Sequence, residues 1–326
     1  MANEEKKPKI NLAVYWGAAC GGCCVSVLDV HEALFTVIEH ANLVFWPIAL
    51  DIKVKDVEAM EDGFIDVCLF NGAIRNSENE HMAKLLRQKT KVMVAYGSCS
   101  HMGGIPGLGN FSNKAGIFDR AFFTSESTVN EEKVVPLEEF EVAEGILTLP
   151  KFYNDVKKLD DVIPVEYYLP GCPPQTERLV EVFLAIVTGA VLPPAGSVVG
   201  AHEKTLCDEC DRKKTDNKLI KEFKRPWDID DDGETCLLEQ GVICMGPATR
   251  GGCGARCISG NAPCRGCYGP AADITDPGAK MMSAIATMID ANDKDEIEKI
   301  IEQIEDPAGT FYRFSLPASI LRRTII

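Results

Sequence analysis

The sequence predicts an α/β fold with a mostly parallel sheet, followed by a small, irregular cysteine-rich domain and by C-terminal helices. Short apolar runs alternate with helix-like segments over residues 10–190, which is typical of such a sheet. Eight of the fourteen cysteines then fall between Cys207 and Cys267, in a stretch rich in glycine and proline. The domains are expected to divide the 326 residues as 1–195, 196–275 and 276–326.

The first half of the sheet follows from three apolar runs. Residues 10–16 (INLAVYW) are the first expected strand, which ends in the glycine-containing loop GAACGGCC. One amphipathic helix is expected after this loop. Its apolar stripe comprises Val25, Leu28, Leu34, Phe35, Ile38 and Ala41. Residues 41–48 indicate a second strand, ended by Pro47, and residues 64–73 a third.

The second half continues the alternation. A helix is expected over residues 77–90, with a serine near its start, and a fourth strand over 91–99. Residues 166–172 lead into a helix with prolines at its start, where they are tolerated. This order predicts a sheet covered by helices on both faces, of flavodoxin-like type. A linker is expected at 192–204. Helices that pack back on the body are expected at 279–290 and 295–305.

Composition excludes several classes of protein. The net charge of −15 argues against binding to nucleic acid, where a basic patch would be expected. No run approaches the roughly 20 apolar residues that a membrane span needs. The first residues contain no twin-arginine pair, long apolar region or small-residue cleavage site. We therefore expect a cytoplasmic protein, in which cysteines favour metal or cluster ligation over disulfides.

Four cysteines of the first domain follow strand-like runs, although they lie far apart in the sequence. They are Cys20, Cys23, Cys99 and Cys172. Because ligands bind outside the carboxyl ends of parallel strands, one edge of the sheet could collect all four. The glycines of Cys20-Gly21-Gly22-Cys23 allow a tight turn. Taken alone, this motif would equally suit zinc or a thioredoxin-like redox pair.

The eight later cysteines are spaced C-x2-C, C-x7-C, C-x3-C and C-x2-C. They are Cys207, Cys210, Cys236, Cys244, Cys253, Cys257, Cys264 and Cys267. Eight thiols make two sets of four, the number that a cubane iron–sulfur cluster needs. Four-thiolate zinc sites use similar spacings, so two zinc sites are an alternative. Clusters in series would explain all twelve cysteines at once, whereas structural zinc leaves the first four without purpose.

The other chemically active residues receive plainer interpretations. Cys68 lies in an apolar strand and Cys24 directly follows Cys23, so we expect packed thiols at both positions. The loop GGIPGLGN (103–110) lacks the strand–turn–helix context of a nucleotide loop and is expected to pack against a partner or cluster. No Ser/His/Asp constellation is present, so no residue is assigned as catalytic. The five histidines are expected on the surface or in the core, with only His202 near a cysteine set.

The motifs together resemble the small subunit of [NiFe] hydrogenases over most of the chain. The resemblance rests on CGGC near the first strand, GSC after a later strand, PGCPP before a helix, and CLLEQGVICMGPATRGGCGARC…PCRGC. The phrases FNGAIRNSENEHMAKLLR, GGIPGLGN and LCDEC…EFKRP are similar to the gamma subunit of the methyl-viologen-reducing, deazaflavin-non-reducing type. In methanogens that type belongs to a cytoplasmic complex with heterodisulfide reductase.

The resemblance implies three [4Fe-4S] clusters and no nickel, flavin or nucleotide in this chain. Cys20, Cys23, Cys99 and Cys172 would hold the proximal cluster, Cys253, Cys257, Cys264 and Cys267 the medial one, and Cys207, Cys210, Cys236 and Cys244 the distal one. Three positions depart from many relatives. Cys207 stands where they have His, Cys257 where some have Pro, and Cys24 where many have Glu. The last departure puts a proton-path role for that position in doubt.

The function implied by the resemblance is electron transfer during dihydrogen oxidation, with the active site on a large partner subunit. Electrons would pass to a small [2Fe-2S]-type adaptor and a heterodisulfide-reductase-like flavoprotein complex. One alternative is the same subunit beside a large partner that lacks nickel and serves another donor. The other alternative is a zinc-stapled scaffold protein.

Overall fold

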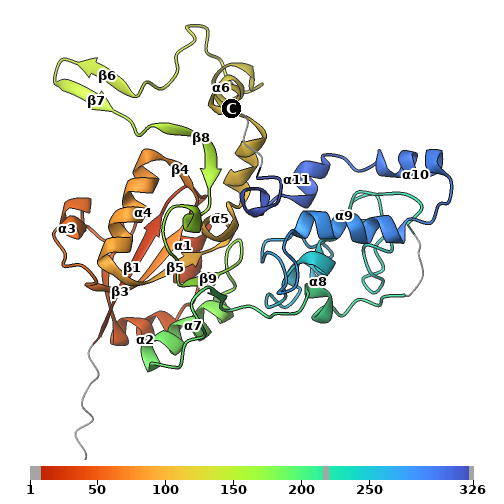
Figure 1. Cartoon of the computed structure of the whole chain (residues 1–326), viewed down its shortest axis with the longest axis horizontal. Coiled ribbons are helices and arrows are strands. Elements are labelled where there is room, and N and C mark those ends of the chain that lie inside the picture. The colour runs from red at the N-terminus through yellow and green to blue at the C-terminus, as the bar shows by residue number, and fades with distance from the viewer. Residues whose placement is uncertain (1–8, 216–219, 323–326) are drawn as a thin grey trace, which may run out of the picture.

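The computed structural model describes residues 9–215 and 220–322 of the chain. Two lobes lie side by side, an α/β lobe and an irregular lobe that includes the last helices (Figure 1). Within the described ranges, no helix has both the length and the apolar character that crossing a bilayer requires.

A six-stranded sheet forms the centre of the first lobe, in the order β10-β9-β5-β3-β1-β2. Its strands are β1 (Ile10–Trp16), β2 (Ala41–Phe45), β3 (Ile65–Asn71), β5 (Thr90–Tyr96), β9 (Tyr167–Leu169) and β10 (Ser197–Val198). All neighbouring strands run parallel. The order β2-β1-β3-β5-β9 is that of a flavodoxin-like sheet, which confirms the predicted fold class.

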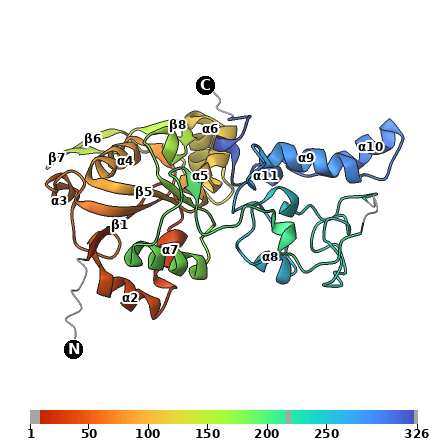
Figure 2. The same ribbon diagram turned by 60° about the horizontal axis from the view of Figure 1, so that its bottom comes forward.

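Helices cover both faces of this sheet (Figures 1 and 2). The first face packs against α1 (Gly22–Leu28), α2 (Ala33–His40) and α7 (Thr176–Thr188), and the second against α3 (Val54–Glu58) and α4 (Ser77–Lys89). Asn76 caps α4, because its side chain accepts a hydrogen bond from the Asn79 backbone N–H at 2.8 Å. Strands buried on both faces explain why their sequences are continuous apolar runs.

The single helix expected after the first strand is wrong. The chain forms α1 and α2, separated at residues 29–32, where His31 has a φ of +51°. The predicted stripe is also wrong, because Val25, Leu28, Phe35 and Ile38 are exposed and Ala41 belongs to β2. The buried positions are instead Val27, Val30 and Val37. The break resets the helical phase, so positions that share a face of one long helix no longer do so.

The segment between β5 and β9 builds an additional layer. It contains α5 (Ser98–Met102), η1 (Ile105–Phe111), α6 (Lys114–Asp119), η2 (Arg120–Thr124), β6 (Glu139–Val142), β7 (Gly145–Thr148), β8 (Phe152–Lys157) and η3 (Leu159–Asp161). Strand β8 pairs antiparallel with β4 (Ile74–Asn76), while β6 and β7 pair with each other and with no other strand of the described residues.

Short elements make up the second lobe. They are η4 (Leu206–Asp208), η5 (Gly246–Ala248), α8 (Arg256–Ser259), α9 (Pro277–Met288), α10 (Lys294–Ile301), α11 (Pro307–Phe311) and η6 (Leu316–Ala318). One apolar core joins Leu238 and Ile258 of the cysteine-rich part to Met281 of α9 and Phe311 of α11. The two predicted C-terminal helices are confirmed. Strand β10 lies inside the segment expected to be a linker and pairs with β9.

The chain's C-terminal part also contacts the first lobe. Gly104 donates its backbone N–H to the Phe314 carbonyl at 3.1 Å. Pro317 lies so close to Gly103 and Gly107 that a Cβ on either would overlap its ring. The loop 103–110 therefore packs on the chain's own C-terminal segment, and Gly104 lies beside the thiol of Cys99, one of the predicted cluster ligands.

Candidate metal centres

The first cysteine set gathers at the carboxyl edge of the sheet. Cys20, Cys99 and Cys172 follow β1, β5 and β9, and Cys23 lies in the first turn of α1. Burial raises the pKa of the Cys23 thiol, and the neighbouring thiols of Cys99, Cys172 and Cys20 raise it further. The structure thus brings together four thiols that the sequence separates by up to 152 positions (172 minus 20).

Two glycines make room for this set. Gly97 has a φ of +84°, and a Cβ there would overlap the sulfur of Cys23. A Cβ on Gly104 would lie 2.6 Å from the sulfur of Cys99. Cys23 and Cys99 are buried, whereas Cys20 and Cys172 are exposed. One side of the set is therefore enclosed by this chain, and the other is open to a partner.

The two unassigned cysteines are packed thiols, as predicted. Cys24 is fully buried and accepts a hydrogen bond from Asn71 Nδ2 at 3.2 Å, while the same amide group donates to the Tyr15 carbonyl at 2.6 Å. Cys68 is fully buried in β3, and burial raises its pKa to about 12. A thiol in such an environment is inert.

The second set comprises Cys207, Cys210, Cys236 and Cys244. Burial raises the pKa of Cys207 to about 12, Lys214 opposes this shift, and the other three thiols of the set add to it. Cys244 accepts backbone hydrogen bonds from Gly246 and from Cys264, the latter at 3.4 Å. Backbone N–H groups directed at sulfur are a common means of tuning cluster sites.

The third set comprises Cys253, Cys257, Cys264 and Cys267. Burial raises the pKa of Cys267 to about 12, and Cys253, Cys172 and Cys257 raise it further. Burial also raises the pKa of Cys264, with contributions from Cys244 and Cys267. Two hydrogen bonds give the position of this set. The backbone N–H of Cys264 donates to the Cys244 sulfur of the second set at 3.4 Å. Ser98, next to Cys99 of the first set, donates its hydroxyl to the Cys267 carbonyl at 2.5 Å. The third set therefore adjoins both other sets.

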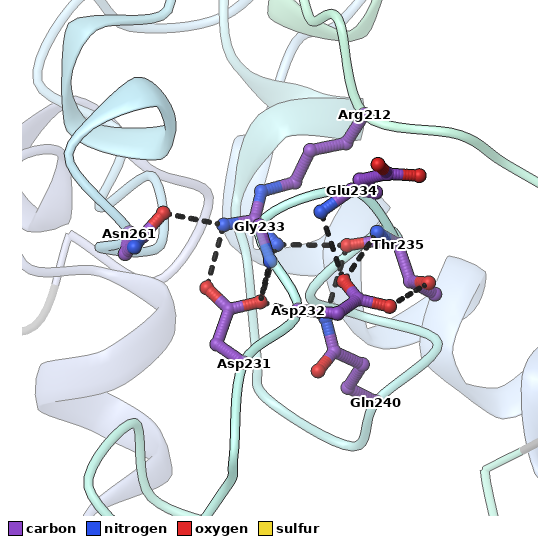
Figure 3. A network of polar contacts seen from close by, with 8 residues as sticks. All are labelled: Arg212, Asp231, Asp232, Gly233, Glu234, Thr235, Gln240 and Asn261. Atoms are coloured by element: carbon purple, nitrogen blue, oxygen red, sulfur yellow. Dashed lines mark hydrogen bonds and ion pairs between the residues drawn. The ribbon is translucent and has the colours of Figure 1, made fainter.

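A buried ion pair joins the loops of the second and third sets (Figure 3). Arg212 donates to Asp231 from both Nη atoms, at 2.7 and 2.6 Å, with the arginine side chain 5% exposed and the aspartate side chain 12% exposed. Arg212 also donates to the Thr235 carbonyl at 2.8 Å and to Asn261 Oδ1 at 3.1 Å. Gln240 donates to the same carboxylate at 3.0 Å. This network fixes the chain between Cys210 and Cys236 against the chain between Cys257 and Cys264.

A second carboxylate positions the Cys253 loop. Glu209 accepts hydrogen bonds from the backbone N–H groups of Gly252 and Gly254, and its Oε1 lies 2.5 Å from His202 Nδ1. His202 therefore lies near a cysteine set, as predicted. Sequence reasoning missed Glu209 and Arg212. Glu209 directly precedes Cys210 and Arg212 lies two residues after it, but nothing in the spacing distinguishes these two residues from neighbouring charged residues.

The donor chemistry fits clusters better than a catalytic pocket. Among residues 9–215 and 220–322, no three His, Cys, Asp or Glu side chains lie together as a ready site for a single ion. The thiols are nevertheless close enough to raise one another's pKa. Without a cation these buried thiols stay protonated, and bound iron would favour the thiolate.

Comparison with known proteins gives consistent matches. The family model described as "NADH ubiquinone oxidoreductase, 20 Kd subunit" matches residues 20–186. An F420-non-reducing hydrogenase iron–sulfur subunit from Archaeoglobus profundus is 40% identical over 321 residues, which are 97% of this chain and 99% of that protein. An F420-non-reducing hydrogenase subunit from Methanothermobacter thermautotrophicus is 39% identical over 317 residues, 96% of each chain.

A solved structure shares the fold. A chain of the [NiFeSe]-hydrogenase from Dm. baculatum superposes with a TM-score of 0.50 at 20% identity, and the match covers 81% of this chain and 95% of that chain.

Proposed function

Because this chain belongs to the family of F420-non-reducing hydrogenase iron–sulfur subunits, which are hydrogenase small subunits, we propose that its twelve clustered cysteines hold three [4Fe-4S] clusters. The first set would hold the proximal cluster, the third the medial one and the second the distal one. The observation that supports this proposal is that the third set adjoins both other sets, through the hydrogen bond from Cys264 to Cys244 and the one from Ser98 to Cys267. When bound, such clusters exchange single electrons at potentials between roughly −700 and +450 mV.

The chain's own residues enclose the proposed clusters and hold them in place. Cys23, Cys99, Cys244 and Cys264 are buried, so water is kept from one side of each set. Backbone N–H groups of Ala255 and Arg256 point at Cys253, as those of Gly246 and Cys264 do at Cys244. Hydrogen bonds of this kind stabilise negative charge on sulfur and set the potential of a cluster.

The hydrogenase large subunit is the partner proposed for the first set. The exposed thiols of Cys20 and Cys172 need a covering surface to exclude water. Beside Cys20, the large side chains of Trp16, Val25 and Leu28 are exposed on β1 and α1. Apolar groups in such a position indicate a buried interface. The large subunit would carry the nickel–iron site where dihydrogen is oxidised.

The acceptor side is proposed at the second set. Cys207, Cys210 and Cys236 are partly exposed in the second lobe. The resemblance supports a small [2Fe-2S]-type adaptor there, followed by a heterodisulfide-reductase-like flavoprotein complex in the cytoplasm. Trp227, which is exposed and lies under the Arg225 guanidinium, gives this lobe a large contact residue.

Metal analysis tests the proposal. Protein purified without oxygen should contain about twelve iron and twelve acid-labile sulfide per chain, from three clusters of four. Fewer than about two four-iron clusters per chain would overturn it. A colourless protein with stoichiometric zinc would support the scaffold alternative instead.

A further inference from the structure

A two-stranded hairpin projects from the first lobe and contacts little of it. We define the arm as residues 137–150, which contain β6 and β7. It extends on the side of the molecule away from the second lobe (Figure 1). Twelve of its fourteen residues are exposed, the exceptions being Val142 and Pro150. An isolated two-stranded hairpin is at best marginally stable in water, so packing elsewhere is expected to stabilise this one.

One face of the arm is apolar. The register pairs Phe140 with Leu147 and Val142 with Gly145, which places these side chains on a common face. Phe140 is 56% exposed and Leu147 60% exposed. The other face combines Ile146, which is 68% exposed, with Glu139 and Glu141. Exposed large apolar groups in a contiguous patch mark an interaction site.

The arm is also strongly acidic. It contains four glutamates and no Lys or Arg. The glutamates are Glu138, Glu139, Glu141 and Glu144. Only Glu138, at the base, has a basic partner, Lys114 at 3.0 Å, among the ion pairs of the described residues. An apolar strip flanked by free carboxylates is complementary to an apolar groove with a basic rim.

An open apolar groove of about 380 Å³ lies at the base of the arm. Its apolar lining includes five large side chains, which are Phe118, Phe122, Leu137, Leu149 and Phe152. Leu137 and Leu149 are both more than half exposed. The arm and the groove therefore form one continuous apolar surface.

The base of the arm is fixed to the edge of the sheet that carries the first cysteine set. Ser77, the first residue of α4, exchanges hydrogen bonds with the backbone of Lys151, each at 3.0 Å. Asn110 of η1 bonds both backbone groups of Val156 in β8, at 2.7 and 3.1 Å. Helix η1 follows the loop in which Gly104 contacts the sulfur of Cys99. A partner that covers the first set therefore comes within reach of the arm.

We propose that the arm is an assembly element that docks on the hydrogenase large subunit, with Phe140 and Leu147 in an apolar groove and the glutamates against its basic rim. This proposal rests on the proposed function, which places the large subunit at the first set. A second copy of this chain lacks complementarity, because the chain carries a net charge of −15 and the arm would meet like charge. The acceptor would bind at the second lobe, on the side away from the arm.

The test uses the intact complex, purified without oxygen through a tag on this chain. The double variant Phe140→Ser, Leu147→Ser should lower the amount of large subunit retained per small subunit at least tenfold. Acid-labile sulfide per small subunit, which the nickel–iron site of the large subunit does not contribute, should stay unchanged. The double variant Glu139→Lys, Glu141→Lys should do the same at 0.1 M salt, with a smaller loss at 0.5 M because salt screens charge. Val191→Ser, at a fully exposed valine of the same lobe, is the matched control.

The results separate this proposal from the proposed function. Retention of the large subunit at the wild-type ratio in both arm variants would overturn the docking proposal alone. So would equal loss in the Val191→Ser control. A photoactivatable cross-linker in place of Ile146 should label the large subunit, and labelling of an adaptor or of a second copy instead would overturn the proposal. Absence of a large subunit from the wild-type complex would count against the proposed function itself.

Discussion

Replacing Asp231 by Asn should destabilise the second lobe strongly. The substitution keeps the shape of the side chain but leaves the Arg212 guanidinium buried without its counter-ion. Removing one partner of a buried ion pair typically costs about 3–5 kcal/mol, because the remaining charge is poorly solvated. With a urea dependence of about 2 kcal/mol per molar, the unfolding midpoint should fall by roughly 2 M.

The assay follows the visible iron–sulfur absorbance of the anaerobic protein through a urea series at pH 7. Glu234→Gln is the matched control, since it breaks the exposed Lys213–Glu234 pair in the same loop region and should leave the midpoint unchanged. Arg212→Met combined with Asp231→Asn should be less damaging than Asp231→Asn alone, because no charge stays buried. Equal midpoints for wild type and Asp231→Asn would refute the reasoning.

The pH dependence provides a further check on this ion pair. The Arg212 guanidinium holds the pKa of Asp231 well below its ordinary value. The ionised Asp231 carboxylate therefore contributes its full stabilisation above the unfolded pKa of about 3.9. This stabilisation is lost as the pH falls from there through the lower folded pKa. The difference between wild type and Asp231→Asn should stay constant from pH 8 to about pH 5. A difference that already shrinks within this range would show that Asp231 is not held ionised.

Three other substitutions probe the cysteine sets. Gly97→Ala should remove about four iron per chain, because the new Cβ overlaps the Cys23 sulfur. Gly196→Ala is the control, since Gly196 also has a positive φ of +91° but no atom near its Cβ, and this variant should keep its iron. Metal analysis of both proteins checks this, and full iron in Gly97→Ala would contradict it. Cys68→Ser should keep full iron and lower only the thermal midpoint, since it places a hydroxyl in the core. Glu209→Ala leaves the N–H groups of Gly252 and Gly254 unpaired and should therefore weaken iron retention in the third set. EPR spectra should show one weakened signal, and Glu209→Gln should partly restore it.

The sheet and its thiol edge could be predicted from the sequence because the signals are local. Strands such as β3 are continuous apolar runs, and a parallel sheet places their carboxyl ends at one edge. The sequence alone therefore groups Cys99 and Cys172 with Cys20. The packed state of Cys68 followed for the same reason, since it lies inside such a run.

The features that sequence reasoning missed depend on contacts between distant segments. The break at His31 places Val27 and Val37 on the sheet, and no residue near the break is a helix terminator such as proline. The strands of the arm have alternating residues like any strand, but nothing in their sequence shows that β6 and β7 form a separate two-stranded sheet. Arg212 finds its partners 19 and 49 residues along the chain.

The second lobe shows how loops with little regular structure can keep two sets of thiols in order. Its apolar core joins the cysteine loops to α9 and α11, so the C-terminal helices fold with these loops as one unit. The loops themselves are held by buried charge, through Arg212 and Glu209. Such contacts stabilise less than apolar packing of equal volume, but they leave few alternative arrangements. Phe314 and Pro317 extend this arrangement to the first lobe, where Phe314 accepts the Gly104 N–H beside Cys99 and Pro317 packs on Gly103.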